Sequence, residues 1–184
     1  VPSHRTLKMS DTSRESGPLY VIPNALYFPS GFATVALGAA RTALDAAIAM
    51  ATKKIPVSAP GQRVLRDMGT IQRQIGQAEA IWGAARAYLN ENHARLWEGA
   101  TKNLSVTTEE KIGVRLSATH AIRQAAEVVD IAYNLSGATA IFASSPVQRR
   151  FRDVHTITQQ VQGQMYHYDT AGQFYLGMEP QGSI

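Results

Sequence analysis

Apolar residues recur at alternating steps of three and four over most of this 184-residue chain, and this spacing constrains the fold more than any other feature. Such steps return a side chain to one face of an α-helix, whereas a strand repeats every second residue. No period-two segment of any length is present, so the sequence predicts an all-α protein. The clearest stripe consists of Val64, Met68, Ile71, Ile75, Ala78, Trp82, Ala85 and Leu89.

Proline, glycine and polar residues interrupt this pattern and set the expected boundaries. Residues 1–23 hold several prolines and predict an irregular lead-in. A first helix is expected over 26–54, with Pro29 tolerated only in its first turn. A loop over 53–61 and a second helix over about 62–101 follow.

The third and fourth helices carry recognisable start signals. Thr107 and Glu110, three residues apart, predict a capping box at the start of the third helix. Pro146 suits the first turn of the fourth, with Ser144 or Ser145 as its cap, and that helix is expected to end near Gly172 or Gly177. Four helices with short or moderate loops predict an antiparallel up-down-up-down four-helix bundle.

Two apolar stripes lie side by side on the third helix, which is more than one face of a bundle helix requires. They predict self-association of the chain, as a dimer or a tetramer. The first stripe is Val114, Ala118, Ala121, Ala125, Val128, Ala132 and Leu135; the second is Ile112, Leu116, Thr119, Ile122, Ala126, Val129 and Tyr133.

Composition narrows the functional classes. The chain has no cysteine, which excludes disulfides and thiolate metal sites. Its 18 basic and 14 acidic residues are interspersed, so a nucleic-acid partner is not expected. The first twenty residues lack the apolar core of a signal peptide, which favours the cytoplasm. Residues 31–51 are apolar, but Arg41 and Asp45 in their middle favour a buried helix over a membrane span.

Several short motifs carry a family resemblance. Segment 144–156 (SSPVQRRFRDVHT) follows the small-residue segment 135–140 (LSGATA) and resembles the last-helix signature of the acyl-CoA dehydrogenase fold. Their order is closest to that of the two-component flavin monooxygenases built on this fold. Segments 67–72 (DMGTIQ) and 76–80 (GQAEA) resemble the second helix of such enzymes, and 1–5 (VPSHR) resembles the exit from their middle β domain.

The resemblance implies that the chain is the C-terminal part of a larger flavin enzyme. Residues 26–184 correspond to an acyl-CoA dehydrogenase C-terminal bundle, and residues 1–25 to the linker from a missing middle β domain. The implied activity is a monooxygenase that hydroxylates a small aromatic or amine substrate with oxygen and reduced flavin, FMN or FAD. A flavin reductase is its expected partner, and the chain alone is not expected to be active.

Flavin binding requires a site for the phosphate group. A helix N-terminus offers free N–H groups and partial positive charge, so Ser144 and Ser145 are candidates, with Gln148 as an added donor. Equally, the serines can simply cap the helix and Gly137 can simply allow close packing. The residues that the resemblance places beside the flavin are Gln72, Ser136, Gly137 and Gln148, with Lys54 as a cation for the phosphate.

Two residues are candidates for the chemistry itself. In the resembling monooxygenases a histidine lies about two helical turns after the Arg-Asp pair, where this chain has Gln160. Glutamine forms hydrogen bonds but cannot serve as a general base, which favours a substrate that is already nucleophilic, such as an amine. His155 carries an imidazole that could donate to the peroxide or take a proton, but its register is displaced from that histidine. No histidine has metal-ligand spacing, so no metal is expected.

Two other functions remain open. An acyl-CoA dehydrogenase-type flavoprotein would retain FAD and be bleached by an acyl-CoA. A non-catalytic helical oligomerisation module is favoured by the glutamine at position 160.

Overall fold

The computed structural model describes residues 1–6, 13, 15–55 and 64–182, and every regular secondary-structure element within them is a helix. The all-α prediction is therefore confirmed for the described residues. Five α-helices are present: α1 (Asn24–Ala51), α2 (Gly69–Asn103), α3 (Thr108–Ser136), α4 (Pro146–Gln159) and α5 (Tyr166–Tyr175). Short 3₁₀ turns lie between or before them: η1 (Ser3–Arg5), η2 (Pro18–Val21), η3 (Leu65–Asp67), η4 (Gly137–Ile141) and η5 (Val161–Gly163).

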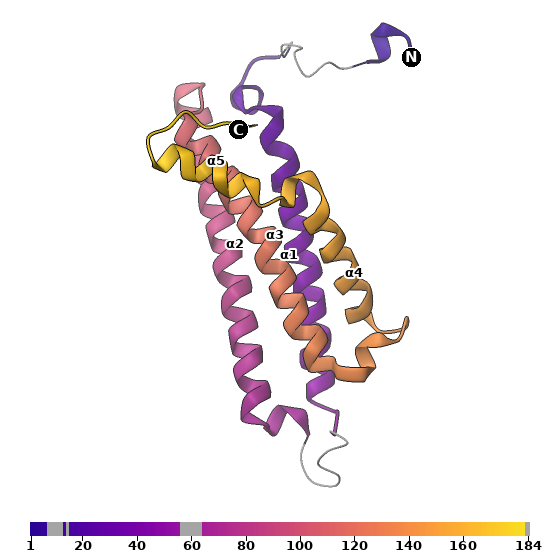
Figure 1. Ribbon diagram of the computed structural model, residues 1–184. Coiled ribbons are helices and arrows are strands. Elements are labelled where there is room, and N and C mark those ends of the chain that lie inside the picture. Colours follow the sequence, from indigo (N-terminus) through magenta and orange to yellow (C-terminus); the bar gives the residue numbers. More distant parts are fainter. Residues whose placement is uncertain (7–12, 14, 56–63, 183–184) are drawn as a thin grey trace.

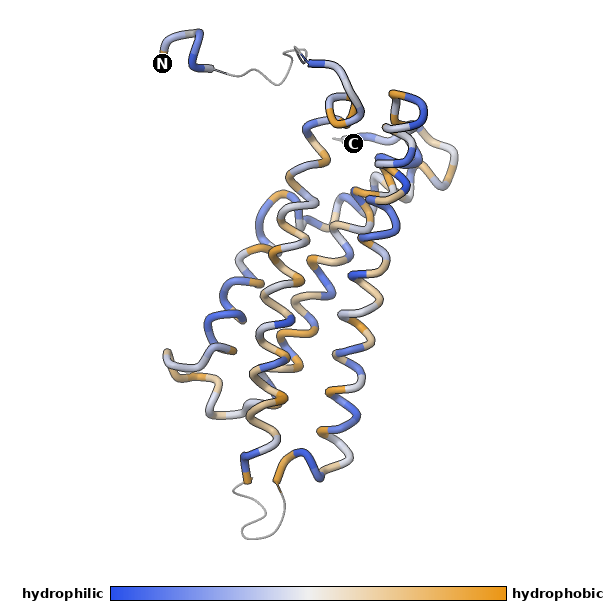
Figure 2. The backbone as a smooth tube through the Cα atoms, turned by 180° about the vertical axis from the view of Figure 1, so that it is seen from behind, coloured by the Kyte–Doolittle hydropathy of each residue, from blue (hydrophilic) through white to orange (hydrophobic). Residues whose placement is uncertain are grey.

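Helix α3 is the centre of the molecule. It packs against α1, α2, α4 and α5, and α4 also packs on α1. Figure 1 shows the successive long helices running in opposite directions, with α5 lying across one end. Figure 2 shows hydrophobic and hydrophilic residues alternating along each helix, as expected for helices with one buried side.

Both apolar stripes of α3 are covered within the chain. All seven residues of the first stripe are buried, and so are Ile112, Thr119, Ile122, Ala126 and Val129 of the second. Four neighbouring helices thus account for the wide apolar surface of α3. The two stripes do not require a second copy of the chain, so they do not support the predicted self-association.

The start of α3 follows the sequence prediction. The N–H of Glu110 donates to Thr107 Oγ1 over 3.2 Å, and the N–H of Thr107 donates to Glu110 Oε2 over 2.7 Å. These reciprocal bonds form a capping box and satisfy N–H groups that the helix leaves without partners.

Helix α1 begins two residues earlier than predicted, so Pro29 falls in its second turn and not in its first. A proline there has no N–H to donate to the carbonyl four residues before it, which is that of Ala25. Arg115 of α3 donates from Nη2 to this carbonyl over 2.9 Å. Arg115, which is distant in sequence, therefore satisfies the carbonyl group that Pro29 leaves without an N–H donor.

The second helix begins later than predicted. Met68 is extended, with φ −93° and ψ 123°, and it separates η3 from the first residue of α2, Gly69. The predicted start near Gln62 and the part of the expected loop over 56–61 lie outside the described residues.

The predicted fourth helix is two helices, because α4 ends at Gln159 instead of near Gly172 or Gly177. The side chain of Gln160 accepts a hydrogen bond from the N–H of Gln162 over 2.7 Å, which competes with continued helical bonding. Gly163 lies so close to its neighbours that an added Cβ would be 2.9 Å from the carbonyl oxygen of Ile157. The resulting turn directs α5 across the end of the bundle.

Helix α1 is long and apolar enough to cross a membrane by length and composition alone. The core helix of a globular protein passes the same test, and α1 packs its alanine-rich face on α3 and α4. Arg41 and Asp45 form the predicted ion pair within it, at 2.7 Å.

Candidate functional site

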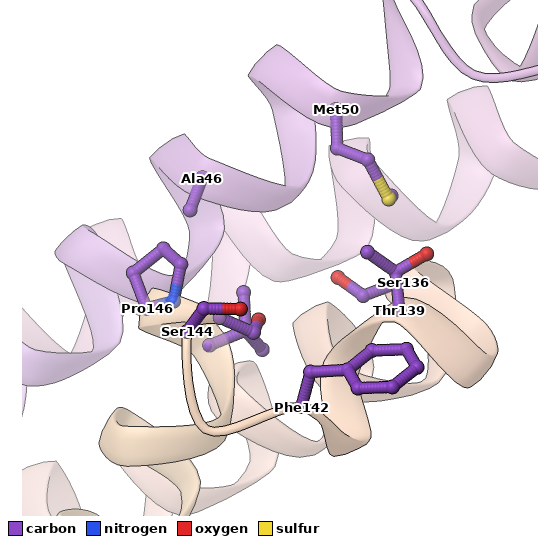
Figure 3. A pocket seen from close by; sticks show the side chains of 9 residues that line it. Ala46, Met50, Ser136, Thr139, Phe142, Ser144 and Pro146 are labelled. Atoms are coloured by element: carbon purple, nitrogen blue, oxygen red, sulfur yellow. The ribbon is translucent and has the colours of Figure 1, made fainter.

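A cavity of about 260 Å³ lies where α1, the end of α3, η4 and the start of α4 meet. Met50 of α1 lies opposite Ser136 and Thr139, and Ala46 of α1 lies near Pro146 at the start of α4 (Figure 3). Its lining combines apolar side chains with several hydroxyl groups, a composition suited to a ligand with a polar end. The lining residues are Ala46, Met50, Ser136, Thr139, Phe142, Ser144, Ser145, Pro146 and Val147.

Lys54 joins the end of α1 to this cavity. Its Nζ donates to the carbonyl oxygen of Ser136 over 2.7 Å and to Thr139 Oγ1 over 2.9 Å, and both acceptors belong to cavity-lining residues. It forms no ion pair with any residue that the structure describes. A half-buried ammonium group held only by neutral oxygens retains an uncompensated positive charge beside the cavity.

Gly137 is required by its backbone conformation and not by the nearness of Lys54. Its φ of 55° lies in the left-handed region, which an L-residue adopts only with strain. A Cβ at this position would lie 3.7 Å from Lys54 Nζ. The sharp turn at Gly137 thus ends α3 and places η4 along the cavity.

The start of α4 borders the cavity, which Ser145, Pro146 and Val147 help to line. Ser145 is the N-cap residue, yet its side chain forms no capping hydrogen bond, and Pro146 occupies the first helical position. The prediction that Ser144 or Ser145 caps the helix through its side chain is therefore wrong for the described structure. Their hydroxyl groups, and the N–H groups of the first turn of α4, stay available to a ligand.

Five predicted flavin residues, Lys54, Ser136, Gly137, Ser144 and Ser145, thus come together at one end of the bundle. Ser136, Ser144 and Ser145 line the cavity itself, and Lys54 reaches it through its hydrogen bonds to Ser136 and Thr139, with Gly137 nearby. Gln72 and Gln148 do not line it. Gln72 is exposed on α2 and donates from Nε2 to the carbonyl oxygen of Arg66 over 2.9 Å. Gln148 is half-buried, and its buried Oε1 has no hydrogen-bond partner.

The two residues predicted for chemistry lie farther along α4. Gln160 follows the end of this helix and is about 20 Å from Pro146, at about 1.5 Å per residue. His155 pairs through Nε2 with Asp130 Oδ1 over 2.8 Å, and both side chains are nearly half exposed. The ring of Phe151 lies 4.4 Å from that of His155. Neither Gln160 nor His155 lines the cavity.

A group of buried polar side chains near η5 was not predicted. Arg115 is only 2% exposed, and burial lowers the pKa of its guanidinium group. His167 is equally buried, and burial lowers the pKa of its imidazole. Nothing in the local sequence marks these residues, except that Pro29 leaves a carbonyl that a distant donor must satisfy. Thr139, which also lines the cavity, belongs to the small-residue segment 135–140, so this segment could have been used to predict it.

Comparison with known proteins places the chain in a family. The profile of the family "Acyl-CoA dehydrogenase, C-terminal domain" matches residues 30–164. Indole-3-acetate monooxygenase of Pseudomonas putida is 35% identical over 89% of this chain and 41% of its own length. The oxygenase component of the FADH2-dependent resorcinol hydroxylase of Rhizobium sp. is 26% identical over 99% of this chain and 48% of its own length.

Solved structures share the fold. The crystal structure of 3-HSA hydroxylase from Rhodococcus sp. RHA1 superimposes with a TM-score of 0.87 and 24% identity, covering 99% of this chain and 49% of that one. The chain therefore spans less than half the length of the relatives it matches.

Proposed function

The chain belongs to the acyl-CoA dehydrogenase C-terminal domain family, and from that premise we propose that it is the C-terminal helical part of a flavin-dependent monooxygenase. The proposed reaction hydroxylates a small aromatic or amine substrate. The similarity to indole-3-acetate monooxygenase over 89% of the chain is the observation that carries this proposal. On the same ground, residues 1–25 are the linker from a preceding domain and residues 26–184 are the helical domain.

The cavity at the start of α4 fits the phosphate end of a flavin. Lys54 contributes a positive charge without a carboxylate partner in the described residues, and α4 contributes an N-terminus without a side-chain cap. Together they favour an anion, and the hydroxyl groups of Ser144 and Ser145 supply further donors. Its volume of about 260 Å³ is small for a whole flavin, so we assign the ring to a wall built with other parts of the protein.

When bound, reduced flavin supplies the two electrons with which one atom of O2 enters the substrate while the other leaves as water. The helical part then has to bind the cofactor, orient the substrate and exclude water. Gln160 and His155 are our candidates for groups at the reacting end. Gln160 can donate hydrogen bonds, and His155, held by Asp130, can accept or release a proton.

The partners follow from the same proposal. A flavin reductase supplies the reduced flavin, for which FADH2 is favoured by the name of the resorcinol hydroxylase relative, with FMN as the other choice. The protein acts in the cytoplasm as a homodimer or homotetramer. Phe28 and Val35, which are 54% and 61% exposed on the outer side of α1, support such an association.

Replacing Lys54 by methionine in the full-length protein tests the proposed phosphate-binding site formed by Lys54 and the start of α4. The Lys54→Met variant should bind reduced FAD and reduced FMN about 10-fold more weakly, because one charge-assisted contact to phosphate is lost. Anaerobic titration followed by flavin fluorescence measures the affinity. The exposed neighbour Lys53 offers a matched control, and Lys53→Met should change the affinity less than about 2-fold, as expected for an exposed charge. Equal effects of the two substitutions would rule out a specific phosphate contact at Lys54.

A further inference from the structure

Helix α5 is held to the rest of the bundle by a small and mostly polar surface. Three of its ten residues are buried, His167, Thr170 and Ala171, and only Ala171 among them is apolar. Neither cluster of buried apolar side chains in the described structure contains a residue of α5. Burial of apolar area is the main stabilising contribution in a fold, and α5 gains little of it. Its position across the end of the bundle (Figure 1) therefore depends largely on polar contacts.

His167 makes the hydrogen bond that ties α5 to the turn before it. Its side chain is 2% exposed, and its Nε2 lies 2.9 Å from the carbonyl oxygen of Val161 in η5. Because a carbonyl oxygen only accepts, Nε2 carries a proton and donates. In the neutral ring Nδ1 then holds the lone pair, and it forms no hydrogen bond with residues that the structure describes. A second proton can therefore be added only at Nδ1.

The groups around His167 oppose this second proton. Arg115 of α3, which is also 2% exposed, is the charged side chain that acts on it, and its guanidinium group donates to a side-chain amide oxygen of η5. A second cation of α3, Arg123, donates to the carbonyl oxygen of Gly163 at the end of η5. The η5 turn has no titratable side chain, and Tyr166 of α5, with its ring centroid 4.2 Å from that of His167, supplies no carboxylate. An imidazolium ion here would be a further buried cation without an opposite charge among the described residues, which is costly.

This cost disappears when α5 leaves the bundle. In place, burial lowers the pKa of His167, the hydrogen bond to Val161 raises it and Arg115 lowers it, and the net change is a decrease. In water an imidazole has its ordinary pKa of about 6.5. The detached form therefore binds a proton more readily than the docked form, so acid favours detachment. The effect is absent well above pH 6.5 and grows as the pH falls below it.

We propose that α5 is an acid-released segment of the fold: protonation of His167 beside Arg115 detaches α5 from α3 while α1, α2, α3 and α4 stay folded. Detachment leaves both apolar clusters of the described structure intact, because α5 contributes to neither. Segments with little buried apolar area open separately from the rest of a protein. The inference is independent of the proposed function, since it uses only contacts within this chain.

Amide hydrogen exchange of the full-length protein, followed by mass spectrometry, tests this release. Exchange rates corrected for the intrinsic rate at each pH give protection factors, which report how often a segment opens. Between pH 7.5 and pH 5.5 the protection factors of residues 167–175 should fall about 10-fold, as for one group with a pKa near 6.5 that is protonated only in the open form. Unchanged protection factors in α5 would overturn the proposal.

Urea separates local release from unfolding of the whole domain. A local opening exposes little surface, so 1 M urea at pH 5.5, a concentration of about 1 M being well below a typical midpoint, should lower the protection factors of α5 less than about 2-fold. Amides in the middle of α3 exchange through global unfolding, and their protection factors should fall about 5-fold or more. The same urea dependence in α5 and α3 would show that α5 opens only with the whole domain, and the proposal would fail.

The variant His167→Gln identifies the titrating group. Glutamine keeps a donor for the carbonyl oxygen of Val161 but does not titrate, so the protection factors of α5 should differ less than about 2-fold between the two pH values. His4, an exposed histidine of η1, offers a matched control, and His4→Gln should retain the full decrease of about 10-fold. A His167→Gln variant with the pH response of the wild type would exclude His167 as the group that releases α5.

A pair of Arg115 variants tests the role of the neighbouring cation with His167 left in place. Arg115→Lys keeps the positive charge and should keep the response to acid. Arg115→Gln removes the charge, so the docked form accepts the proton more readily and the response should be at least about 2-fold smaller. Equal responses of the two variants would contradict the part that the proposal gives to Arg115.

Discussion

His167 couples the stability of the fold to pH. Burial lowers the pKa of this imidazole, and the nearby Arg115 lowers it further, although the hydrogen bond to Val161 opposes them. The unfolded chain, with a pKa near 6.5, therefore binds a proton more readily than the folded chain does. The stability that neutral His167 contributes is present above pH 6.5 and is lost as the pH falls below it.

The midpoint of thermal unfolding should accordingly decrease between pH 7.5 and pH 5.5. His120, whose pKa is also lowered by burial, should contribute in the same direction. The variant His167→Gln keeps a donor for the Val161 carbonyl but does not titrate in this range, so its midpoint should depend less on pH. Parallel pH profiles for the variant and the wild type would contradict the role of His167.

Single residues also decide how closely α2 and α3 approach each other. Gly113 of α3 faces the buried side chain of Asn92, and an added Cβ would lie 2.3 Å from Asn92 Oδ1. Gly113→Ala should lower the free energy of unfolding by about 1–3 kcal/mol, the usual effect of overpacking. Gly76 of α2 has nothing within 4 Å, so Gly76→Ala should stabilise the chain by about 0.5–1 kcal/mol. Urea unfolding of both variants measures the difference, and a neutral Gly113→Ala would show that Asn92 moves aside.

At the scale of elements, local signals predicted some helix ends well and others poorly. The capping box of Thr107 and Glu110 is a contact between residues three apart, so the sequence contains all of it. The end of α4 depends on Gly163 fitting against Ile122 and Ile157, and on Arg123, which lies 40 residues away from Gly163. Such tertiary contacts are not visible in the apolar periodicity, and for this reason one helix was predicted where there are two.

The difference between local signals and tertiary contacts also explains why the wide apolar surface of α3 was misinterpreted. Two adjacent stripes show that most of a helix is buried, but they do not show what buries it. The two stripes together predicted self-association, whereas α1, α2, α4 and α5 of the same chain cover both. The central position of α3 follows from how the other helices are arranged around it, and it cannot be inferred from the sequence of α3 alone.

At the scale of the molecule, the sequence alone could group those candidate residues that lie close together in the chain. Ser136, Ser144 and Ser145 lie within ten residues of one another, at a junction between two helices, and they line one cavity. The hydrogen bond of Lys54 to Ser136 spans 82 residues, and the role of Lys54 as a cation for the flavin phosphate stays a prediction from the family resemblance.

The remaining candidate residues show the limit of that reasoning. Gln72 and Gln148 do not line the cavity, and Gln160 lies at the other end of α4. The chain spans less than half the length of its relatives, and under the proposed function the rest of the flavin site would be built by surfaces outside these residues. Their geometry is not contained in these 184 residues.

The most direct test of the central claim is isotopic. The full-length protein should be supplied with reduced FAD, indole-3-acetate and ¹⁸O2, and the product examined by mass spectrometry. We expect a hydroxylated product that carries one ¹⁸O atom and that requires reduced flavin. A protein that binds reduced flavin but yields no labelled product, or a product whose oxygen comes from water, would contradict the assignment as a monooxygenase.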